Sequence, residues 1–255
     1  MTDLIVTSEG DVQTWMLNRP EARNALSPGL VDAMASALAT AERTGVRSVV
    51  IHGAGRSFCA GADLAYLIDC SAQERSPRPF LASICDLTLA FEQSPVAMVA
   101  AIHGHAVAGG LELALACDVI VATPDALIGD GHVKNNLVPG GGSSVRILDR
   151  LGTATGTWLA LSGELMSASA LQSSGWIKTL VPADQLLAEA HDTASRLARV
   201  PAAAQTRFKQ LLRGPAEPVR AALQHELDVF EEHWATSDVV DHLTRFLHPD
   251  PKDAS

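Results

Sequence analysis

Short apolar runs separated by polar or glycine-rich stretches recur along the first half of the chain. The runs at residues 4–6 and 12–17 flank Glu9-Gly10-Asp11, and this arrangement predicts a β-hairpin. Three later runs are short and mostly apolar, which is typical of buried strands. They occupy residues 47–52, 96–102 and 119–121.

Helical spacing of apolar residues appears between these runs. Ser27-Pro28 is a helix start signal, because serine favours the N-cap and proline favours the first helical position. Leu30, Met34 and Leu38 then form an apolar stripe at helical spacing. Strand, turn and helix continue to alternate, which predicts right-handed parallel crossover units in an α/β core.

The strand pattern disappears from about Pro201 onward. Three helices are predicted instead, around residues 208–212, 219–232 and 239–246. No repeat, low-complexity tract or linker indicates a second independent domain. We therefore predict a core over residues 1–198 and a helical segment over residues 199–255.

Composition excludes several classes of partner. The 255 residues are 47% hydrophobic and 19% charged, which is ordinary for a soluble globular protein. A formal net charge of −10 disfavours nucleic acid and anionic membrane surfaces, since both repel a negative protein. The chain lacks a signal-peptide pattern and any apolar run near the ~20 residues of a membrane helix. We therefore expect a cytoplasmic protein.

Cysteine and histidine positions give little sign of a metal site. Cys59, Cys70, Cys85 and Cys117 contain no CxxC pair, so neither a disulfide framework nor a cysteine metal site is expected. His103 and His105 bring no further ligand at a recognisable spacing. We predict no bound metal.

Two glycine-rich turns each follow a predicted strand, at residues 56–64 and 103–112. A substrate oxygen can come within about 3 Å of a main-chain nitrogen only where the side chains are small. The second turn leads into a helix-favouring stretch, whose first N–H groups and partial positive charge would face the turn. Together the turns predict an oxyanion hole.

Four ordered segments now carry a family resemblance. They are residues 17–26, the two glycine-rich turns, and Ile128-Gly129 leading to Val138-Pro139-Gly140-Gly141-Gly142. With the helical tail, the chain resembles the crotonase, or enoyl-CoA hydratase/isomerase, superfamily. The resemblance implies an α/β fold, a spiral of ββα units over residues 1–198. It also implies that residues 199–255 build a homotrimer or a dimer of trimers.

The resemblance assigns roles to four residues. The N–H groups of Ala62 and Gly109 would hold a thioester carbonyl as it becomes an enolate, and Glu112 would be the first of the family's two catalytic glutamates. The second glutamate position carries His132. An imidazole can give or take a proton near neutral pH, so His132 would be the base or the acid. Asp130 either orients His132 or is an acid on a surface loop.

Three functional hypotheses remain open. The first is an enoyl-CoA hydratase or isomerase that uses Glu112 and His132. The second is another crotonase-type reaction, hydrolysis or decarboxylation, in which His132 activates water or protonates an enolate. The third is an acyl-CoA binding protein without turnover. In each, the acyl-CoA is the ligand and coenzyme A belongs to the substrate, so no separate cofactor is expected.

The resemblance also implies where an acyl-CoA would lie. The predicted coenzyme A groove contains Ala22, Arg23, Arg56, Ala60, Asp63 and Leu64. Guanidinium groups suit phosphate, so Arg23 and Arg56 are the predicted phosphate partners. Some family members place a lysine where this chain has Ala65, and Arg245 or Lys252 would have to compensate. The predicted acyl pocket contains Tyr66, Leu67 and His105.

Overall fold

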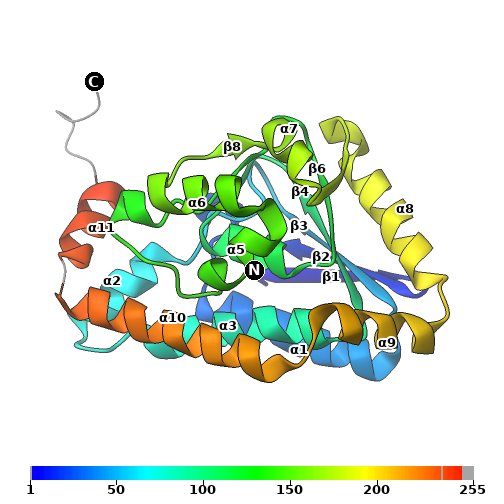
Figure 1. Cartoon of the computed structure of the whole chain (residues 1–255), viewed down its shortest axis with the longest axis horizontal. Coiled ribbons are helices and arrows are strands. Elements are labelled where there is room, and N and C mark those ends of the chain that lie inside the picture. Colours follow the sequence, from blue (N-terminus) through cyan, green and yellow to red (C-terminus); the bar gives the residue numbers. More distant parts are fainter. Residues whose placement is uncertain (1, 237, 249–255) are drawn as a thin grey trace.

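A six-stranded sheet forms the centre of the molecule in the computed structural model, which describes residues 2–236 and 238–248 (Figure 1). The strand order is β1-β2-β3-β4-β6-β9. The pair β1–β2 is antiparallel, and every other neighbouring pair is parallel. The predicted hairpin and parallel α/β core are therefore confirmed. The strands are β1 (Leu4–Glu9), β2 (Val12–Leu17), β3 (Ser48–Gly53), β4 (Ala97–Ile102), β6 (Val119–Ala122) and β9 (Ile177–Leu180).

A second, smaller sheet stands beside the first and carries the start of the second glycine-rich turn. It contains β5 (His105–Val107), β7 (Leu127–Gly129) and β8 (Met166–Ser167). β7 lies between the other two strands, parallel to β5 and antiparallel to β8. This sheet fixes the segments that precede Ala108 and Asp130.

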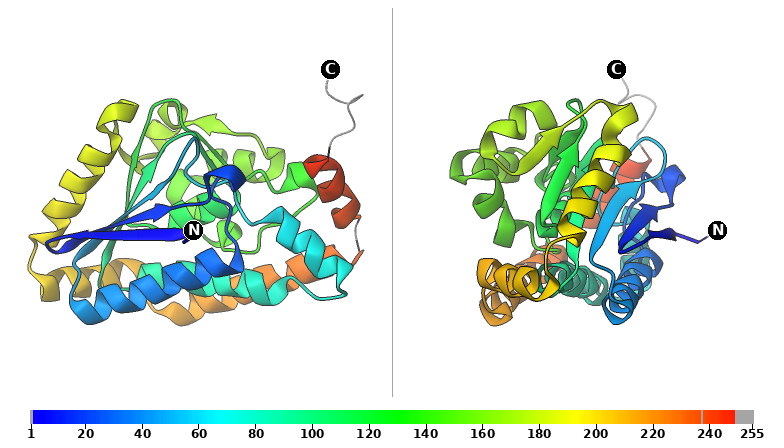
Figure 2. Two further views of the ribbon diagram at one scale, coloured as in Figure 1. Left: turned by 180° about the vertical axis from the view of Figure 1, so that it is seen from behind. Right: turned by 90° about the vertical axis from the view of Figure 1, so that its right-hand side faces the viewer.

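Helices cover both sheets. α1 and α3 run side by side in one layer with α9 and α10, which follow each other end to end, as Figures 1 and 2 both show. α8 packs on the large sheet against β2, β3, β4 and β6. The helices are α1 (Pro28–Thr44), α2 (Leu64–Ala72), α3 (Arg78–Gln93), α4 (Gly109–Ala116), α5 (Ser143–Leu151), α6 (Thr153–Ser162), α7 (Ala168–Leu171), α8 (Leu186–Ala198), α9 (Ala202–Arg213), α10 (Ala216–Thr236) and α11 (Val239–Leu247).

The central strands are buried on both faces, as their apolar composition predicts. Successive side chains of a strand point to opposite faces. Ile51 and Met98 join the large core, while Val50 and Val99 pack on the other face with Leu186 and its neighbours on α8. Because both faces are covered, the carboxyl ends of β3 and β4 are the places where the chain can present polar backbone groups.

α1 begins where the sequence predicts it. Ser27 is the N-cap, and its hydroxyl accepts a hydrogen bond from Leu30 N at 3.2 Å. Pro28 is the first helical residue. The predicted stripe of Leu30, Met34 and Leu38 is buried in the large core. The N-cap and the buried apolar stripe therefore both confirm the predicted start and orientation of α1.

The C-terminal segment packs on the core of its own chain. α10 lies along α3, where Arg78 pairs with Glu231 at 2.9 Å. The inner face of α10 is buried through Leu223, Leu227 and Phe230. The three predicted C-terminal helices are confirmed as α9, α10 and α11, each longer than the sequence pattern indicates or starting earlier. Within the described part of the chain, no helix is both long enough and apolar enough to span a bilayer.

The Ser27 cap gives a first prediction. Ser27→Ala removes the acceptor of the Leu30 N–H, so the free energy of unfolding should fall by about 1 kcal/mol. Ser36→Ala is the matched control, because Ser36 is exposed inside the same helix and alanine is the better helix former there. Urea unfolding followed by circular dichroism measures both. Equal stability of the two variants would show that the cap contributes nothing.

Candidate active site

The two glycine-rich turns lie against each other at the end of the large sheet. Cys59 N donates to His105 O at 3.0 Å, and Val107 N donates to Cys59 O at 3.1 Å. A side chain at Gly110 would collide with the backbone of Cys59. The close approach of the two turns therefore depends on glycine at this position.

Two backbone N–H groups meet where the turns touch. A Cβ atom on Gly109 would lie 3.1 Å from the nitrogen of Ala62. Among the residues that the structure describes, none accepts a hydrogen bond from the N–H of Ala62 or of Gly109. Gly109 is the first residue of α4, where N–H groups have no partner within the helix. The site thus presents two neighbouring donors to a ligand.

The backbone before Gly109 is strained. Ala108 has φ 51° and ψ −119°, a conformation that costs a residue with a side chain about 1–3 kcal/mol. Hydrogen bonds hold it on both sides: Ala108 N donates to Gly129 O at 3.1 Å, and Glu112 N donates to Ala108 O at 2.9 Å. These contacts set the direction of the Gly109 N–H.

Glu112 lies one helical turn after Gly109 and is only 2% exposed. Its Oε1 atom accepts hydrogen bonds from Gly141 N at 2.9 Å and Ser143 N at 3.1 Å, at the start of α5. Burial raises the pKa of Glu112 to about 7, the positive charge of His132 opposes the rise, and the charge of Glu226 adds to it. At neutral pH this carboxyl group can therefore both take and release a proton.

His132 is held by Asp130. The imidazole Nδ1 lies 2.8 Å from Asp130 Oδ1, and both side chains are buried. The Ser143 hydroxyl donates to the other oxygen of Asp130. Asp130 is thus a buried partner of His132, which settles the two alternatives that the sequence left open. Ser143 bridges the two groups, because its N–H binds Glu112 and its hydroxyl binds Asp130.

The charge of His132 depends on these contacts. Burial alone lowers the pKa of an imidazole, but the charge and hydrogen bond of Asp130, with the charges of Glu112 and Glu226, raise the pKa of His132 to about 9. Asp130 itself has a lowered pKa: burial opposes ionisation, and His132 outweighs it. At pH 7 the pair is an imidazolium and a carboxylate. In the described residues, Nε2 of His132 has no hydrogen-bond partner, so its proton is available to a ligand.

Comparison with known proteins places these features in a family. The sequence model of the family described as enoyl-CoA hydratase/isomerase matches residues 7–251. The chain belongs to this family of enzymes. A 2,3-dehydroadipyl-CoA hydratase of Escherichia coli is 35% identical over 251 residues, covering 97% of this chain and 96% of that protein. A probable enoyl-CoA hydratase of Mycobacterium bovis is 31% identical over 246 residues, covering 96% of this chain and 94% of that protein.

Solved structures of the family share the fold. An enoyl-CoA hydratase/isomerase from Mycobacterium paratuberculosis superimposes with a TM-score of 0.88 at 26% identity, covering 96% of this chain and 98% of that chain. The predicted crotonase-type fold is confirmed.

Most of the residues predicted for the coenzyme A groove are brought together. Ala22 ends a short 3-10 helix (Pro20–Ala22), and the exposed Arg23 follows it. Ala60 N donates to Arg23 O at 3.0 Å, which joins this segment to the first glycine-rich turn. Asp63 and Leu64 start α2 on the same turn. These segments therefore adjoin the first glycine-rich turn, which contains Ala62.

The charged side chains of this region differ in what they contact. The Asp63 carboxylate accepts from Tyr66 N and pairs with Arg19 at 2.8 Å, so it caps α2. Arg56 is exposed in the loop after β3, and its backbone lies beside Gly104. On α11, Arg245 donates to Asp241 O of its own helix. Lys252 lies outside the described residues. The phosphate-binding roles remain predictions.

The residues predicted for the acyl pocket occupy different surroundings. Tyr66 packs edge-on against Phe80, with ring centroids 5.0 Å apart. Leu67 is 2% exposed and belongs to the large core. His105 is half-buried at the start of β5, and burial together with the charge of Arg23 lowers its pKa. His105 therefore lies near Arg23, a residue of the predicted coenzyme A groove.

Sequence reasoning missed several residues of the site. Gly141 lies directly against Glu112, and any side chain there would collide with the carboxylate. Ser143 had one available signal, since it comes directly after the glycine motif at residues 140–142. Glu226 had none, because it comes more than eighty positions later and acts only through the fold. In the fold Glu226 is buried and binds the start of α5.

The cysteine and histidine residues that the sequence analysis considered for a metal site contact other parts of the protein. Cys59, in the first glycine-rich turn, is buried, and burial raises the pKa of its thiol to about 12, so the thiol is protonated at neutral pH. The imidazole of His103 lies 3.1 Å from Gly55 O. In the described part of the chain, no group of three or more His, Cys, Asp or Glu side chains has a geometry that could hold a metal ion.

The link between Asp130 and His132 gives a second prediction. Asp130→Asn removes the charge that raises the pKa of His132 most and leaves the burial that lowers it, so this pKa should fall from about 9. Titration of 13C-labelled histidine by NMR measures it, with His132→Gln identifying the signal. Asp125→Asn is the control, because Asp125 is exposed. An unchanged His132 titration in Asp130→Asn would contradict the assigned contact.

Proposed function

We propose that this protein is an enoyl-CoA hydratase that stabilises a thioester enolate between the N–H groups of Ala62 and Gly109. The observation that carries the proposal is the buried Glu112–Ser143–Asp130–His132 chain. It links one group with a pKa of about 7 to another with a pKa of about 9. These values suit a base and an acid working at the same neutral pH.

The proposed reaction begins at Glu112. The ionised carboxylate takes a proton from a water molecule as the water oxygen bonds to the β-carbon of the enoyl thioester. The electrons of the carbon–carbon double bond move towards the thioester oxygen, which becomes an enolate oxygen. Two backbone donors at this oxygen would lower the barrier, and loss of one such donor costs about 10²–10³-fold in rate elsewhere.

His132 completes the reaction. Its imidazolium, oriented through Nδ1 by Asp130, gives the Nε2 proton to the α-carbon, and the enolate returns to a thioester carbonyl. One water has then been added across the double bond. Glu112 holds one proton more and His132 one fewer, and proton exchange with solvent restores both. The raised pKa of His132 thus supports the acid among the two roles that the sequence left open.

Decarboxylation is a second candidate, because a charged His132 could equally protonate the enolate left by loss of carbon dioxide. That reaction needs no base to activate water, so the buried and hydrogen-bonded Glu112 would be idle in it. Glu112 therefore favours hydration.

The position of the substrate is part of the same proposal. Coenzyme A would lie along Ala22, Arg23, Ala60, Asp63 and Leu64, with Arg23 and Arg56 facing phosphate oxygens. The acyl group would pass Tyr66 and Leu67 towards Glu112, and His105 would line the channel near Arg23. Ala60, Ala62, Asp63 and Leu64 are half-buried, which supports this path.

The third prediction concerns turnover. Crotonyl-CoA should be hydrated by the wild type, and Glu112→Gln and His132→Gln should each lower kcat/KM by about 10²–10⁴-fold, because each removes one proton-transfer group. Loss of the absorbance of the conjugated thioester measures the rate. Glu42→Gln, an exposed residue of α1, is the control and should behave as wild type.

Other outcomes separate the alternatives. Turnover of a β-carboxyacyl or malonyl-type thioester that survives Glu112→Gln but not His132→Gln would replace hydration by decarboxylation. Tight acyl-CoA binding without turnover of either substrate would indicate a binding protein and overturn the proposed hydratase.

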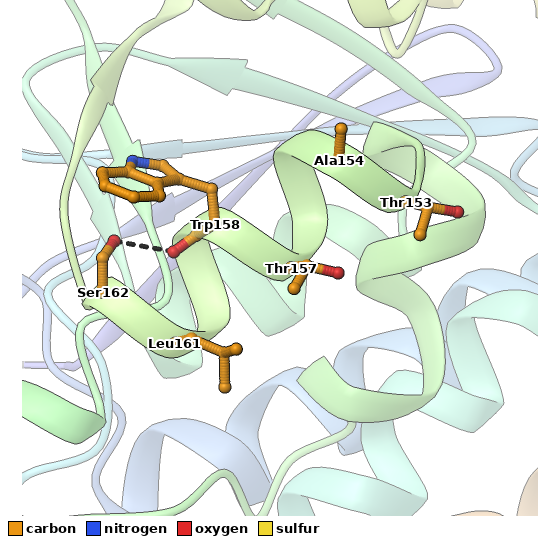
Figure 3. A pocket seen from close by; sticks show the side chains of 6 residues that line it. All are labelled: Thr153, Ala154, Thr157, Trp158, Leu161 and Ser162. Carbon is orange, nitrogen blue, oxygen red and sulfur yellow. Dashed lines mark hydrogen bonds between the residues drawn. The ribbon is translucent and has the colours of Figure 1, made fainter.

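We further propose that the protein forms a homotrimer, alone or as a dimer of trimers. Two different exposed apolar patches support a head-to-tail contact, which closes into a ring when the rotation permits. One is on α6, where Trp158 and Leu161 are 55% and 76% exposed beside a hollow of about 630 Å³ (Figure 3). The other is on α9, where Phe208 and Leu212 are 63% and 72% exposed beside a hollow of about 690 Å³.

The fourth prediction tests this assembly. Light scattering after size exclusion should give three or six times the chain mass of 26.8 kDa. A charge at Phe208 would have to be buried in the contact, so Phe208→Asp should give smaller species. Val6→Asp, at an exposed position of β1, is the control and should keep the wild-type mass. A monomeric wild type would exclude the trimer.

A further inference from the structure

The start of α5 binds two buried carboxylates at once. Four successive N–H groups point to them in alternation. Gly141 N and Ser143 N donate to Glu112 at 2.9 and 3.1 Å. Gly142 N and Ser144 N donate to Glu226 at 2.7 and 2.9 Å. The two carboxylates therefore share one turn, and neither can move without changing the hydrogen bonds of the other.

Hydrogen bonds also hold a carbonyl group of this turn. Arg146 donates through Nη1 to Gly142 O at 3.3 Å, and through Nε and Nη2 to Glu92 at 3.0 and 2.8 Å. Gly142 has φ 108°, in the region that favours glycine, and a Cβ atom there would overlap the Arg146 guanidinium. Of the side chains named here that hold the turn, Glu112, Arg146 and Glu92 belong to the core, whereas Glu226 belongs to the C-terminal segment.

The position of Glu226 costs free energy. The residue is 5% exposed on α10, among the buried Leu223, Leu227 and Phe230. A buried carboxylate is tolerated only when hydrogen bonds replace its water. Glu226 has the two N–H donors and the Ser144 hydroxyl. A neutral side chain at position 226 could accept hydrogen bonds from the same N–H groups at a lower desolvation cost. The negative charge of Glu226 therefore needs a separate explanation.

We propose that Glu226 is a positioning residue for the Glu112–His132 pair. Its hydrogen bonds fix the start of α5, and its carboxylate places a negative charge close to both members of the pair. This rests on the proposed function for its catalytic meaning. The C-terminal helix α10 is then part of the catalytic unit of its own chain, beyond any role in assembly.

The charges around the pair fix the expected direction. The charge of Glu226 raises the pKa of both Glu112 and His132. Its removal should lower both values and move the pH profile of kcat/KM towards lower pH. The ionisable groups facing Glu112 are His132 and Asp130 from the segment after β7, Glu226 from α10, Cys85 from α3 and Cys59 from the first turn. Arg146 from α5 faces Cys85.

Glu226→Gln is the decisive variant, because it removes the charge and keeps the shape. We expect kcat to fall about 10-fold to 100-fold as the turn loosens, with KM for crotonyl-CoA nearly unchanged. Both limbs of the pH profile should shift down by about half a unit or more. Glu231→Gln is the matched control: the same change on the same helix, at an exposed carboxylate paired with Arg78. It should match the wild type.

A second readout separates this inference from the proposed function. The pKa of His132, measured by NMR titration of labelled histidine, should fall in Glu226→Gln and stay unchanged in Glu231→Gln, whatever reaction the protein catalyses. A wild type without hydratase activity would overturn the proposed function, and the titration would still decide the inference. If Glu226→Gln matches Glu231→Gln in both kcat and the His132 titration, the inference is wrong. If Glu226→Gln fails to fold, Glu226→Asp is the second variant, because its shorter side chain keeps the charge but cannot reach the N–H groups of α5 in the same way. An unchanged kcat in Glu226→Asp would also overturn the inference.

Discussion

A carboxylate can be buried only where donors are already in place to receive it, and this constraint organises the whole site. Glu112, Glu226, Asp130 and Glu92 are all at most 8% exposed in the region around α5. Their partners are backbone N–H groups, serine hydroxyls, one imidazole, and two arginines, Arg146 and Arg213, that both bind Glu92. Because so few positive charges are present, burial of Glu112 is compensated only in part. Glu112 therefore bears the raised pKa.

The geometry of these donors comes from the backbone more than from side chains. Glycine at 109, 110 and 141 lets segments approach so closely that a Cβ atom would touch or overlap its neighbour. The strained Ala108 turns the chain into α4, so the open N–H of Gly109 and the Glu112 carboxylate share one helix end. Two layers of helices and a sheet buried on both faces hold this backbone in place.

Local features of the fold were predictable from the sequence, and long-range pairings were not. The hairpin, the Ser27 cap, the buried strands and the C-terminal helices each depend on neighbouring residues. The glycine-rich turns and the resemblance indicated Ala62, Gly109, Glu112 and His132 as a group. Asp130 and His132 are two residues apart in irregular chain, so the sequence left their contact as one of two alternatives. The contact exists because β7 ends at Gly129 and the segment after it is buried.

The position of α10 late in the chain means that Glu226 is synthesised after the rest of the site. A ribosome adds residues from the N-terminus, so every group of the site except Glu226 is made before α9 and α10 exist. A nascent chain ending near residue 198 already holds Glu112 and His132, yet its Gly142 and Ser144 N–H groups lack their acceptor. The acceptor of these N–H groups is added only when α10 has been made, so the start of α5 receives its second carboxylate last.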